Sequence, residues 1–464
     1  MEIAGLLRRT LHLAAVLVTA QRTAAILASF LIASCFASRP VEITRPSAKS
    51  FPDLEQEVSK IRGLGFKRPV TFSDKPAEPG TTGTAEYEAQ AISPLGRVYK
   101  RVGLLPESVD FSKALLEFTR LQRMIDYDAS RAVVLVAPEA VKLGQALADD
   151  QARGAAPIIP AVLALAQALQ EQHFRWQEKS RSVPLEDRKL AFGAVAYGDA
   201  VLVGLKYLSS ERRHDDFTDQ LHAIARVGGE LERMGSSLPA MLREKLVFPY
   251  REGGRFVQWA YAARGWNGVN TLFSDPPFSS AQILHPEKYY VKRKQPVRIL
   301  PFGLFRKMTA SPVVDQTLGE SLIAVLLEAS RSRKVAAQIA AGWEADHLSA
   351  YRDGDNLVTA WITAWTDGDS ARMFRGAYRT ALERRHGLRF EPSAGEQDGI
   401  KADLGDRRSM VLQVRGRFVL LLDGVASTRV SELSESAWKD LETSTEPTVI
   451  PFDSAAGAVQ FSNR

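Results

Sequence analysis

Two long stretches with almost no charged residues constrain this chain more than any other feature of its sequence. Residues 158–174 read IIPAVLALAQALQEQHF, and residues 188–209 have LAFGAVAYGDAVLVGLKYL at their centre. Apolar residues that recur with the helical period predict a helix, and a helix that is apolar on most faces is buried. We therefore expect two buried helices in the core of the fold. The inward positions expected for the first are Ile158, Val162, Leu165 and Leu169.

The N-terminus has the features of an export signal. Several arginines precede or interrupt a short apolar stretch that ends in small residues, ILASFLIAS at 26–34. This arrangement is typical of a signal peptide. The residues up to Cys35 resemble a bacterial lipoprotein signal, in which the cysteine becomes the lipidated first residue, and Cys35 is the only cysteine in the chain. We expect lipidation at Cys35, with an ordinary signal peptide or an uncleaved anchor as alternatives.

Composition places the chain among ordinary globular proteins. Of its 464 residues, 45% are hydrophobic and 25% are charged, which excludes a disordered chain and allows two or three domains. The net charge of +6 is small for this length, and no basic run carries interleaved aromatic residues. The sequence therefore gives no support for a nucleic-acid partner.

A segment rich in proline, serine, threonine and glycine follows the expected signal. Residues 73–84 read SDKPAEPGTTGT, which has the composition of a loop or tether. We interpret residues 35–95 as a tether and lead-in, with the globular part beginning near Tyr87.

Several strings of specific residues are distributed along the next two hundred positions. They are ALQEQHF at 168–174, YGDA at 197–200, and the strings LVFPY, GRFV, GWNGVN and HPEKY within 246–290. With these strings the chain resembles a family of bacterial zincin-like zinc metallopeptidases of the H-E-x-x-H type, over about residues 100–390. RGLGFKRPV, at 62–70, resembles the lead-in of the same family. The resemblance implies a mainly helical zincin-like domain with a small sheet.

The zinc-binding residues of that family are replaced in this chain. In the relatives, an H-E-x-x-H helix directly precedes the segment that matches Ala168–Phe174, so its two histidines correspond to Leu163 and Gln167 and its glutamate to Ala164. Two histidines four residues apart bind one zinc, and the glutamate activates the zinc-bound water. The third ligand, a glutamate in an E-G-D-A string, corresponds to Tyr197.

The resemblance therefore implies zinc in the intact relatives, whereas here we expect no metal, no cofactor and no catalytic residue. If the correspondence is right, Leu163, Gln167 and Tyr197 should point into one cleft.

Four polar residues near these positions remain as weaker candidates for binding. They are His173, Asp199, His285 and Glu287. We expect Asp199 to be a hydrogen-bonded structural residue, and the His285 and Glu287 pair to shape a wall of the cleft, with substrate contact as the alternative. A relocated active site would need His173 paired with Asp199 or Glu171 as acid and base.

The last third of the chain has the pattern of a second folded unit. We expect a helix from Leu318 to about Gln338 and Trp343 as a core anchor. The remaining expected elements are strands near 348–351, 358–365 and 418–422, and a helix containing Phe374, Tyr378 and Leu382. This order predicts a small α+β layer of antiparallel strands with one packed helix.

The whole chain is thus expected to be an α+β protein with four parts. These are an export signal at 1–34, a tether and lead-in at 35–95, a zincin-like domain at 96–311, and a C-terminal α+β unit with a loose tail at 312–464. The expected function is that of an exported, lipid-anchored, inactive peptidase relative that binds a protein or peptide, or acts as a scaffold, in the cell envelope. The alternatives are an active zinc metallopeptidase with relocated ligands and a purely structural envelope lipoprotein.

Overall fold

The computed structural model describes most of the chain after the expected signal. The described residues are 50–73, 94–150, 152–183, 185–210, 216–291, 298–301, 304, 307–308, 312–393, 398–439 and 441–444. The expected export signal and Cys35 lie outside them.

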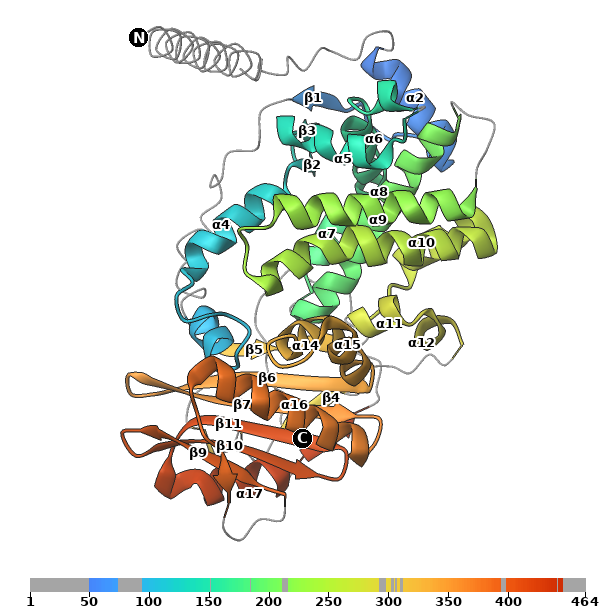
Figure 1. The fold of residues 1–464 in the computed structure, drawn as a ribbon. Helices are drawn as coiled ribbons and strands as arrows, with labels where there is room; N and C mark the ends of the chain where they lie inside the picture. The colour runs from blue at the N-terminus through green and yellow to red at the C-terminus, as the bar shows by residue number, and fades with distance from the viewer. Residues whose placement is uncertain are drawn as a thin grey trace, which may run out of the picture. The chain divides into compact units, whose positions relative to one another are not determined.

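The fold is α+β, as the sequence predicts, with a mainly helical part followed by a part built on a sheet (Figure 1). The helical part comprises α2 (Phe51–Arg62), β1 (Thr71–Ser73), α4 (Phe111–Gln122), β2 (Ile125–Asp128), β3 (Val133–Val136), α5 (Val141–Leu147), α6 (Ile159–Phe174), α7 (Trp176–Arg181), α8 (Glu186–Ser210), α9 (Phe217–Met234), α10 (Ala240–Ser274), α11 (Ser280–Leu284) and α12 (Pro286–Tyr290). The sheet part comprises β4 (Arg298–Pro301), β5 (Val314–Gln316), α14 (Gly319–Leu327), α15 (Arg333–Ala340), β6 (Trp343–Asp353), β7 (Asn356–Trp365), α16 (Gly368–His386), β8 (Glu391–Pro392), β9 (Ile400–Gly405), β10 (Arg408–Arg415), β11 (Phe418–Ala426), α17 (Val430–Lys439) and β12 (Leu441–Ser444).

The two charge-poor stretches form the buried helices α6 and α8. Val162, Leu165 and Leu169 of α6 are fully buried, whereas Ile158 is half-buried because it lies at the N-terminal end of the helix. By length and composition α8 could cross a membrane, but 83% of its most apolar window is buried inside the protein. This burial is typical of a core helix in a globular protein.

Helices α8 and α10 cross at very short range. A Cβ atom on Gly198 would lie 2.3 Å from the carbonyl oxygen of Gly253, and one on Gly253 would lie 2.2 Å from that of Ala194. No side chain fits at either glycine, so the two backbones are in direct contact. Helix α8 packs against α10 at this crossing and also packs against α6.

The globular fold begins earlier than the sequence suggested. Leu54 and Val58 of α2 are buried, and β1 pairs in parallel with β3 in a three-stranded sheet of order β1-β3-β2. The prediction that the globular part begins near Tyr87 is therefore wrong, since residues 51–73 of the expected tether and lead-in already belong to the fold. The amphipathic pattern of residues 51–62 is short, and the segment at 73–84 has the composition of a loop. Nothing in the sequence therefore indicates that residues 51–73 pack with the later helices.

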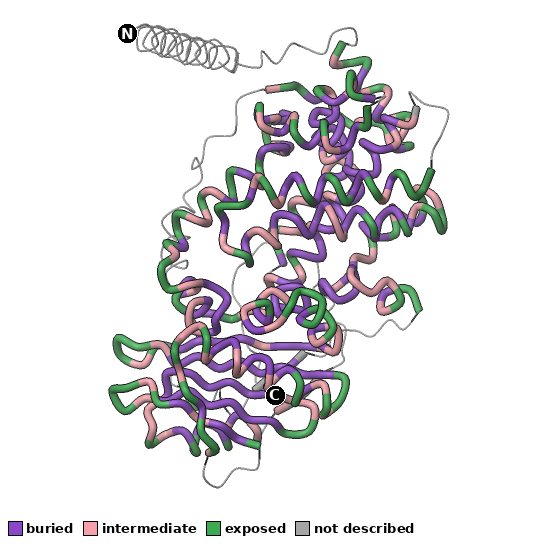
Figure 2. Tube along the Cα trace, in the orientation of Figure 1, coloured by how far each residue is buried: buried purple, intermediate pink, exposed green. Residues whose placement is uncertain are grey.

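The sheet part is larger than the single-helix layer expected from the sequence. Seven strands lie in the order β5-β6-β7-β11-β10-β9-β8, and each strand pairs antiparallel with its neighbours. Side chains alternate between two cores: Leu421 packs with α16 on one face, while Leu420 packs with α17 on the other. Figure 2 shows the resulting burial along the central strands. Both faces are covered, and α17 supplies the second layer.

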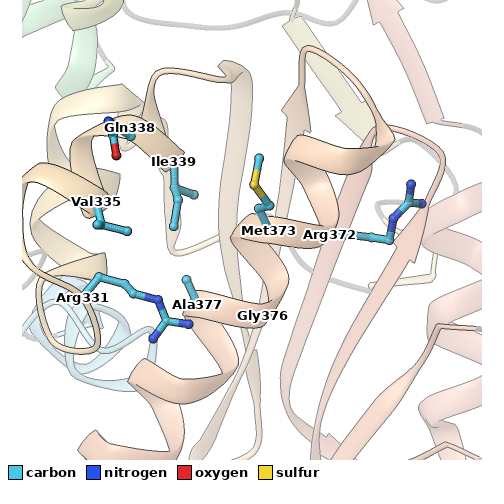
Figure 3. Close-up of a pocket in the computed structure, with 8 residues that line it drawn as sticks. All are labelled: Arg331, Val335, Gln338, Ile339, Arg372, Met373, Gly376 and Ala377. Atoms are coloured by element: carbon cyan, nitrogen blue, oxygen red, sulfur yellow. The ribbon is translucent and has the colours of Figure 1, made fainter.

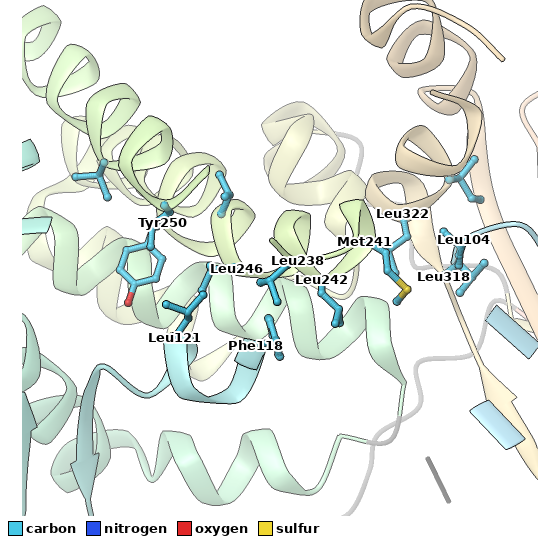
Figure 4. Packing of buried hydrophobic residues seen from close by; sticks show 14 of the residues in the cluster. Leu104, Phe118, Leu121, Leu238, Met241, Leu242, Leu246, Tyr250, Leu318 and Leu322 are labelled. Carbon is cyan, nitrogen blue, oxygen red and sulfur yellow. The ribbon is translucent and has the colours of Figure 1, made fainter. Parts of the chain in front are cut away.

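The long helix expected from Leu318 to Gln338 is two helices. It breaks between α14 and α15, where Ser332 caps the second helix by accepting a hydrogen bond from the backbone N–H of Val335. Trp343 begins β6 and is 3% exposed, in agreement with its predicted core role. Figure 4 shows how residues of α4, α10 and α14 pack together, among them Phe118, Leu242 and Leu322.

Candidate functional site

The positions expected to have lost zinc ligands are parts of the packed core. Leu163 is 1% exposed and Ala164 is fully buried. A Cβ atom on Gly204 of α8 would meet Cδ2 of Leu163 at 2.9 Å, so the leucine side chain fills the space against the α8 backbone. Gln167, one turn further along α6, is half-buried. The α6 positions therefore act in packing between helices.

Tyr197 packs in a different direction. Its ring lies 4.7 Å from the ring of Tyr250 in α10, and burial raises the pKa of its hydroxyl, with the nearby Asp126 acting in the same sense. Leu163 contacts Gly204 of α8, which is seven residues after Tyr197. Seven residues span about 10 Å along a helix. The prediction that Leu163 and Tyr197 share one cleft is therefore wrong, and Tyr197 does not stand in the place of a third ligand beside Leu163.

Asp199 forms a buried ion pair with Arg62. The Nε of Arg62 donates to both carboxylate oxygens of Asp199, at 2.9 and 3.3 Å, and both side chains are 1% exposed. Gln170 of α6 donates to Oδ2 of Asp199 at 3.0 Å and to the carbonyl oxygen of Ala196 at 2.8 Å. Burial raises the pKa of Asp199, while the Arg62 charge and the Gln170 amide oppose that effect.

The same arginine also reaches another of the family-like strings, GWNGVN at 265–270. Its Nη2 donates to Oδ1 of Asn270 at 2.8 Å, and its guanidinium lies 4.4 Å from the ring of Trp266. Helix α10 is kinked at Arg264 and Gly265, which directly precede this tryptophan. The strings around residues 62, 170, 199 and 270 thus meet in one buried polar network, and that network holds α2, α6, α8 and α10 together.

His173 lies beside this network without joining it. Its Nε2 is 2.7 Å from the carbonyl oxygen of Gly65, in the turn that follows α2. Glu171 instead accepts from the backbone N–H of Gln177 at 2.6 Å, and Asp199 is paired with Arg62. The acid–base pair considered for a relocated active site is not formed.

His285 and Glu287 lie at the junction between the helical part and the sheet part. The Nε2 of His285 is 2.7 Å from Oε1 of Glu320 in α14, and Lys288 reaches the other oxygen of Glu320 at 3.4 Å. Glu287 is exposed, with its carboxylate 3.9 Å from Nδ1 of His285. The HPEKY string therefore attaches α12 to α14, which is a positioning role.

Three buried acids, Glu320, Asp346 and Asp187, lie at the start of α14 at this junction. Asp346 accepts from the backbone N–H groups of Leu318 and Gly319, at 2.8 and 3.0 Å, and from the indoles of two tryptophans. Asp187 accepts from the backbone N–H of Ser280, and its burial raises its pKa to about 8. Within the described residues, no group of three or more His, Cys, Asp or Glu side chains is arranged to hold a metal.

A surface groove lies between α15 and α16 (Figure 3). Its volume is about 430 Å³. The walls are formed by Val335, Gln338 and Ile339 of α15 and by Met373, Gly376 and Ala377 of α16. Val335 is 38% exposed and Met373 is 56% exposed, so large apolar side chains face the solvent here.

Arginines frame this groove. Figure 3 shows Arg331 beneath it beside Ala377, and Arg372 at the opposite end of the lining, directed away from Arg331. Arg331 donates to the carbonyl oxygen of Ser330 at 3.0 Å, and Arg372 donates to the exposed carboxylate of Asp369 at 2.6 Å. An apolar floor between basic ends has the character of a binding surface for another macromolecule.

One family model matches part of the chain. Residues 308–434 match a domain of unknown function, DUF8575. The matched segment is less than half of the chain and contains all seven strands of the large sheet together with both walls of the groove. No curated protein and no solved structure matches the chain.

Sequence reasoning missed both Arg62 and the groove. Arg62 lies in the RGLGF string, but nothing local indicates that its partner is 137 residues away. The groove residues follow helical spacing in both α15 and α16, a pattern that predicts burial and gives no sign of exposure. An exposed apolar position can be recognised only after the neighbouring elements are placed.

Proposed function

We propose that this chain is a non-catalytic relative of zincin-like metallopeptidases, exported and lipid-anchored at Cys35, which acts by binding another protein. The observation that carries the loss of catalysis is the packing of Leu163 and Ala164 against α8. Neither side chain can bind zinc or accept a proton, and both are enclosed by other side chains. A substrate has no access to that part of α6.

The helical part then serves as a scaffold. Its polar residues from the family-like strings are engaged in the Arg62–Asp199 network and in the contact between His285 and Glu320. The groove between α15 and α16 supports the binding half of the proposal, because exposed apolar side chains between basic residues favour a protein partner.

The experiment is a cleavage assay on the purified full-length chain. Unfolded casein and a mixture of short peptides are incubated with the protein, with added zinc or with a chelator. We expect no product above the background of a chain-free sample in either condition. Cleavage that requires zinc would support the relocated-ligand alternative and contradict the proposal.

A further inference from the structure

The two walls of the α15–α16 groove present rows of residues with the same spacing. Val335, Gln338 and Ile339 are related as i, i+3 and i+4, and so are Met373, Gly376 and Ala377. Residues at these spacings lie on one face of a helix. Two parallel rows with a hollow between them form the receiving surface for a third helix with apolar residues at the same spacing.

The groove is held open by contacts beneath it. Ser330 Oγ donates to the carbonyl oxygen of Ala377 at 2.9 Å, and Arg384 donates to that of Ala329 at 3.3 Å, which fastens the turn before α15 to α16. Under α16, the ring of Phe374 stacks on Trp365 with centroids 4.4 Å apart. A preformed surface of this kind loses little conformational entropy when a partner binds.

The charges around the groove are mostly positive. The two charged residues that line it, Arg331 and Arg372, are both basic, and α16 contains five arginines against Asp369 and Glu383. A predominantly basic surface attracts a partner whose polar residues are acidic and repels a basic one.

A second cavity nearby has a different character. Its volume is about 310 Å³, and its lining includes Glu232, Glu244 and Arg333. Its lining carries charges of both signs, which pair within the protein, Arg333 with Glu232 at 3.6 Å and Glu244 with Arg251 at 3.7 Å. It therefore has neither the apolar walls nor the single sign of charge that the groove offers.

We propose that the α15–α16 groove binds an amphipathic helix of another protein, with apolar side chains facing the groove and acidic side chains facing its basic rim. This inference rests on the proposed function and names the partner chemistry of the binding surface. We expect the partner helix to approach the groove most closely at Gly376, because a Cβ atom there would meet nothing within 4 Å and the space above the glycine is open.

The experiment uses the full-length chain and a synthetic helix of about 16 residues, with leucines at i, i+3, i+4 and i+7 and glutamates on the other face. A second peptide has the same leucines with lysines in place of the glutamates. Binding is measured by fluorescence anisotropy at low and moderate salt. We expect the acidic peptide to bind about tenfold or more tightly than the basic one, and the difference to shrink as salt rises.

Two matched variants test the location. Gly376→Leu fills the groove. Gly229→Leu adds the same side chain at an exposed position of α9, where a Cβ atom also meets nothing within 4 Å. Both replace a helical glycine by a better helix former, so neither should unfold the chain. We expect G376L to weaken binding of the acidic peptide by about tenfold or more, and G229L to leave it unchanged.

A charge pair tests the basic rim. Arg372→Gln should weaken binding of the acidic peptide by about two- to fivefold, whereas Arg153→Gln should have no effect. Arg153 is a matched control because it also pairs with an exposed aspartate three residues earlier, at 2.6 Å.

Three outcomes would overturn the proposal: no binding of either peptide, equal binding of both, or equal effects of G376L and G229L. Self-association of the chain that G376L abolishes would also overturn it, in favour of a second copy as the occupant. If the peptide-binding measurements fail but the casein assay shows no proteolysis, the non-catalytic proposal still holds. Zinc-dependent proteolysis overturns that proposal whatever the peptides do.

Discussion

Arg62 and Asp199 form an ion pair from which water is almost excluded, with Nε 2.9 Å from Oδ1 and each side chain 1% exposed. The pair joins the first described helix to the middle of α8, across 137 residues of sequence. Because the charges of a buried pair are removed from water, loss of one partner leaves the other without compensation.

Replacement of Arg62 should therefore destabilise the fold strongly. We expect Arg62→Met to lower the free energy of unfolding by about 3–5 kcal/mol, measured by urea denaturation. Asp199→Asn added to Arg62→Met should recover part of that loss, since the remaining buried charge is removed.

The matched control for this prediction is Arg153→Met. Arg153 and Asp150 also form an ion pair, but their side chains are 78% and 90% exposed. Its loss should change the free energy of unfolding by less than about 0.5 kcal/mol. Equal effects of the two arginine substitutions would show that the buried network does not hold the helices together.

Gly319, at the start of α14, should tolerate no side chain. Its φ is +75°, and a Cβ atom would lie 1.9 Å from Oδ1 of Asp187. We expect Gly319→Ala to cost more than about 2 kcal/mol of unfolding free energy, from backbone strain and from the displaced carboxyl. Gly354→Ala is the control, because Gly354 has φ +61° with nothing within 4 Å, so it should lose only about 1 kcal/mol. Similar losses would place the cost in the backbone alone.

The buried Asp187 should make stability depend on pH. Burial raises its pKa to about 8 in the fold, against 3.8 for an ordinary aspartate, so the folded state holds this proton more tightly than the unfolded state does. The stabilising contribution is therefore complete below about pH 4 and is lost as the pH rises towards about 8, by up to about 1.4 kcal/mol per pH unit. Urea denaturation between pH 5 and pH 8, within that window, should show a steeper decline for the natural chain than for Asp187→Asn. Parallel declines would contradict the assignment.

Lipid attachment at Cys35 is testable in a bacterial host. The full-length chain should be recovered in the detergent-extracted membrane fraction, and Cys35→Ser should move it to the soluble fraction. Mass spectrometry of the N-terminal peptide should show a lipid on the cysteine. A soluble natural chain, or a variant that stays in the membrane, would argue against the anchor.

An element of this fold could be predicted where the sequence pattern that indicates it lies within the element itself. The charge-poor stretches of α6 and α8 indicated buried helices directly, because their composition leaves no face for water. The break between α14 and α15 has a local signal as well, the capping residue Ser332, but the apolar pattern continues across it and masked it.

Relationships between distant segments could not be predicted from one sequence. A charged residue such as Arg62 is expected on the surface, and only the packed helices show that Asp199 meets it. The same holds for Met373, whose spacing in α16 favours burial although it is 56% exposed beside the groove. The strings that resemble metallopeptidases lie in the helical part, whereas the apolar groove lies in the sheet part.

We propose that the chain binds no zinc, since Leu163 and Ala164 of α6 are enclosed by packed side chains, and the zinc content of the protein tests this proposal most directly. The full-length chain is purified from zinc-supplemented cells, washed with a mild chelator and analysed by atomic emission for metal per chain. We expect zinc far below one equivalent, and the same unfolding free energy with and without added zinc. One tightly held equivalent of zinc whose removal destabilises the chain or abolishes peptide cleavage would contradict the account.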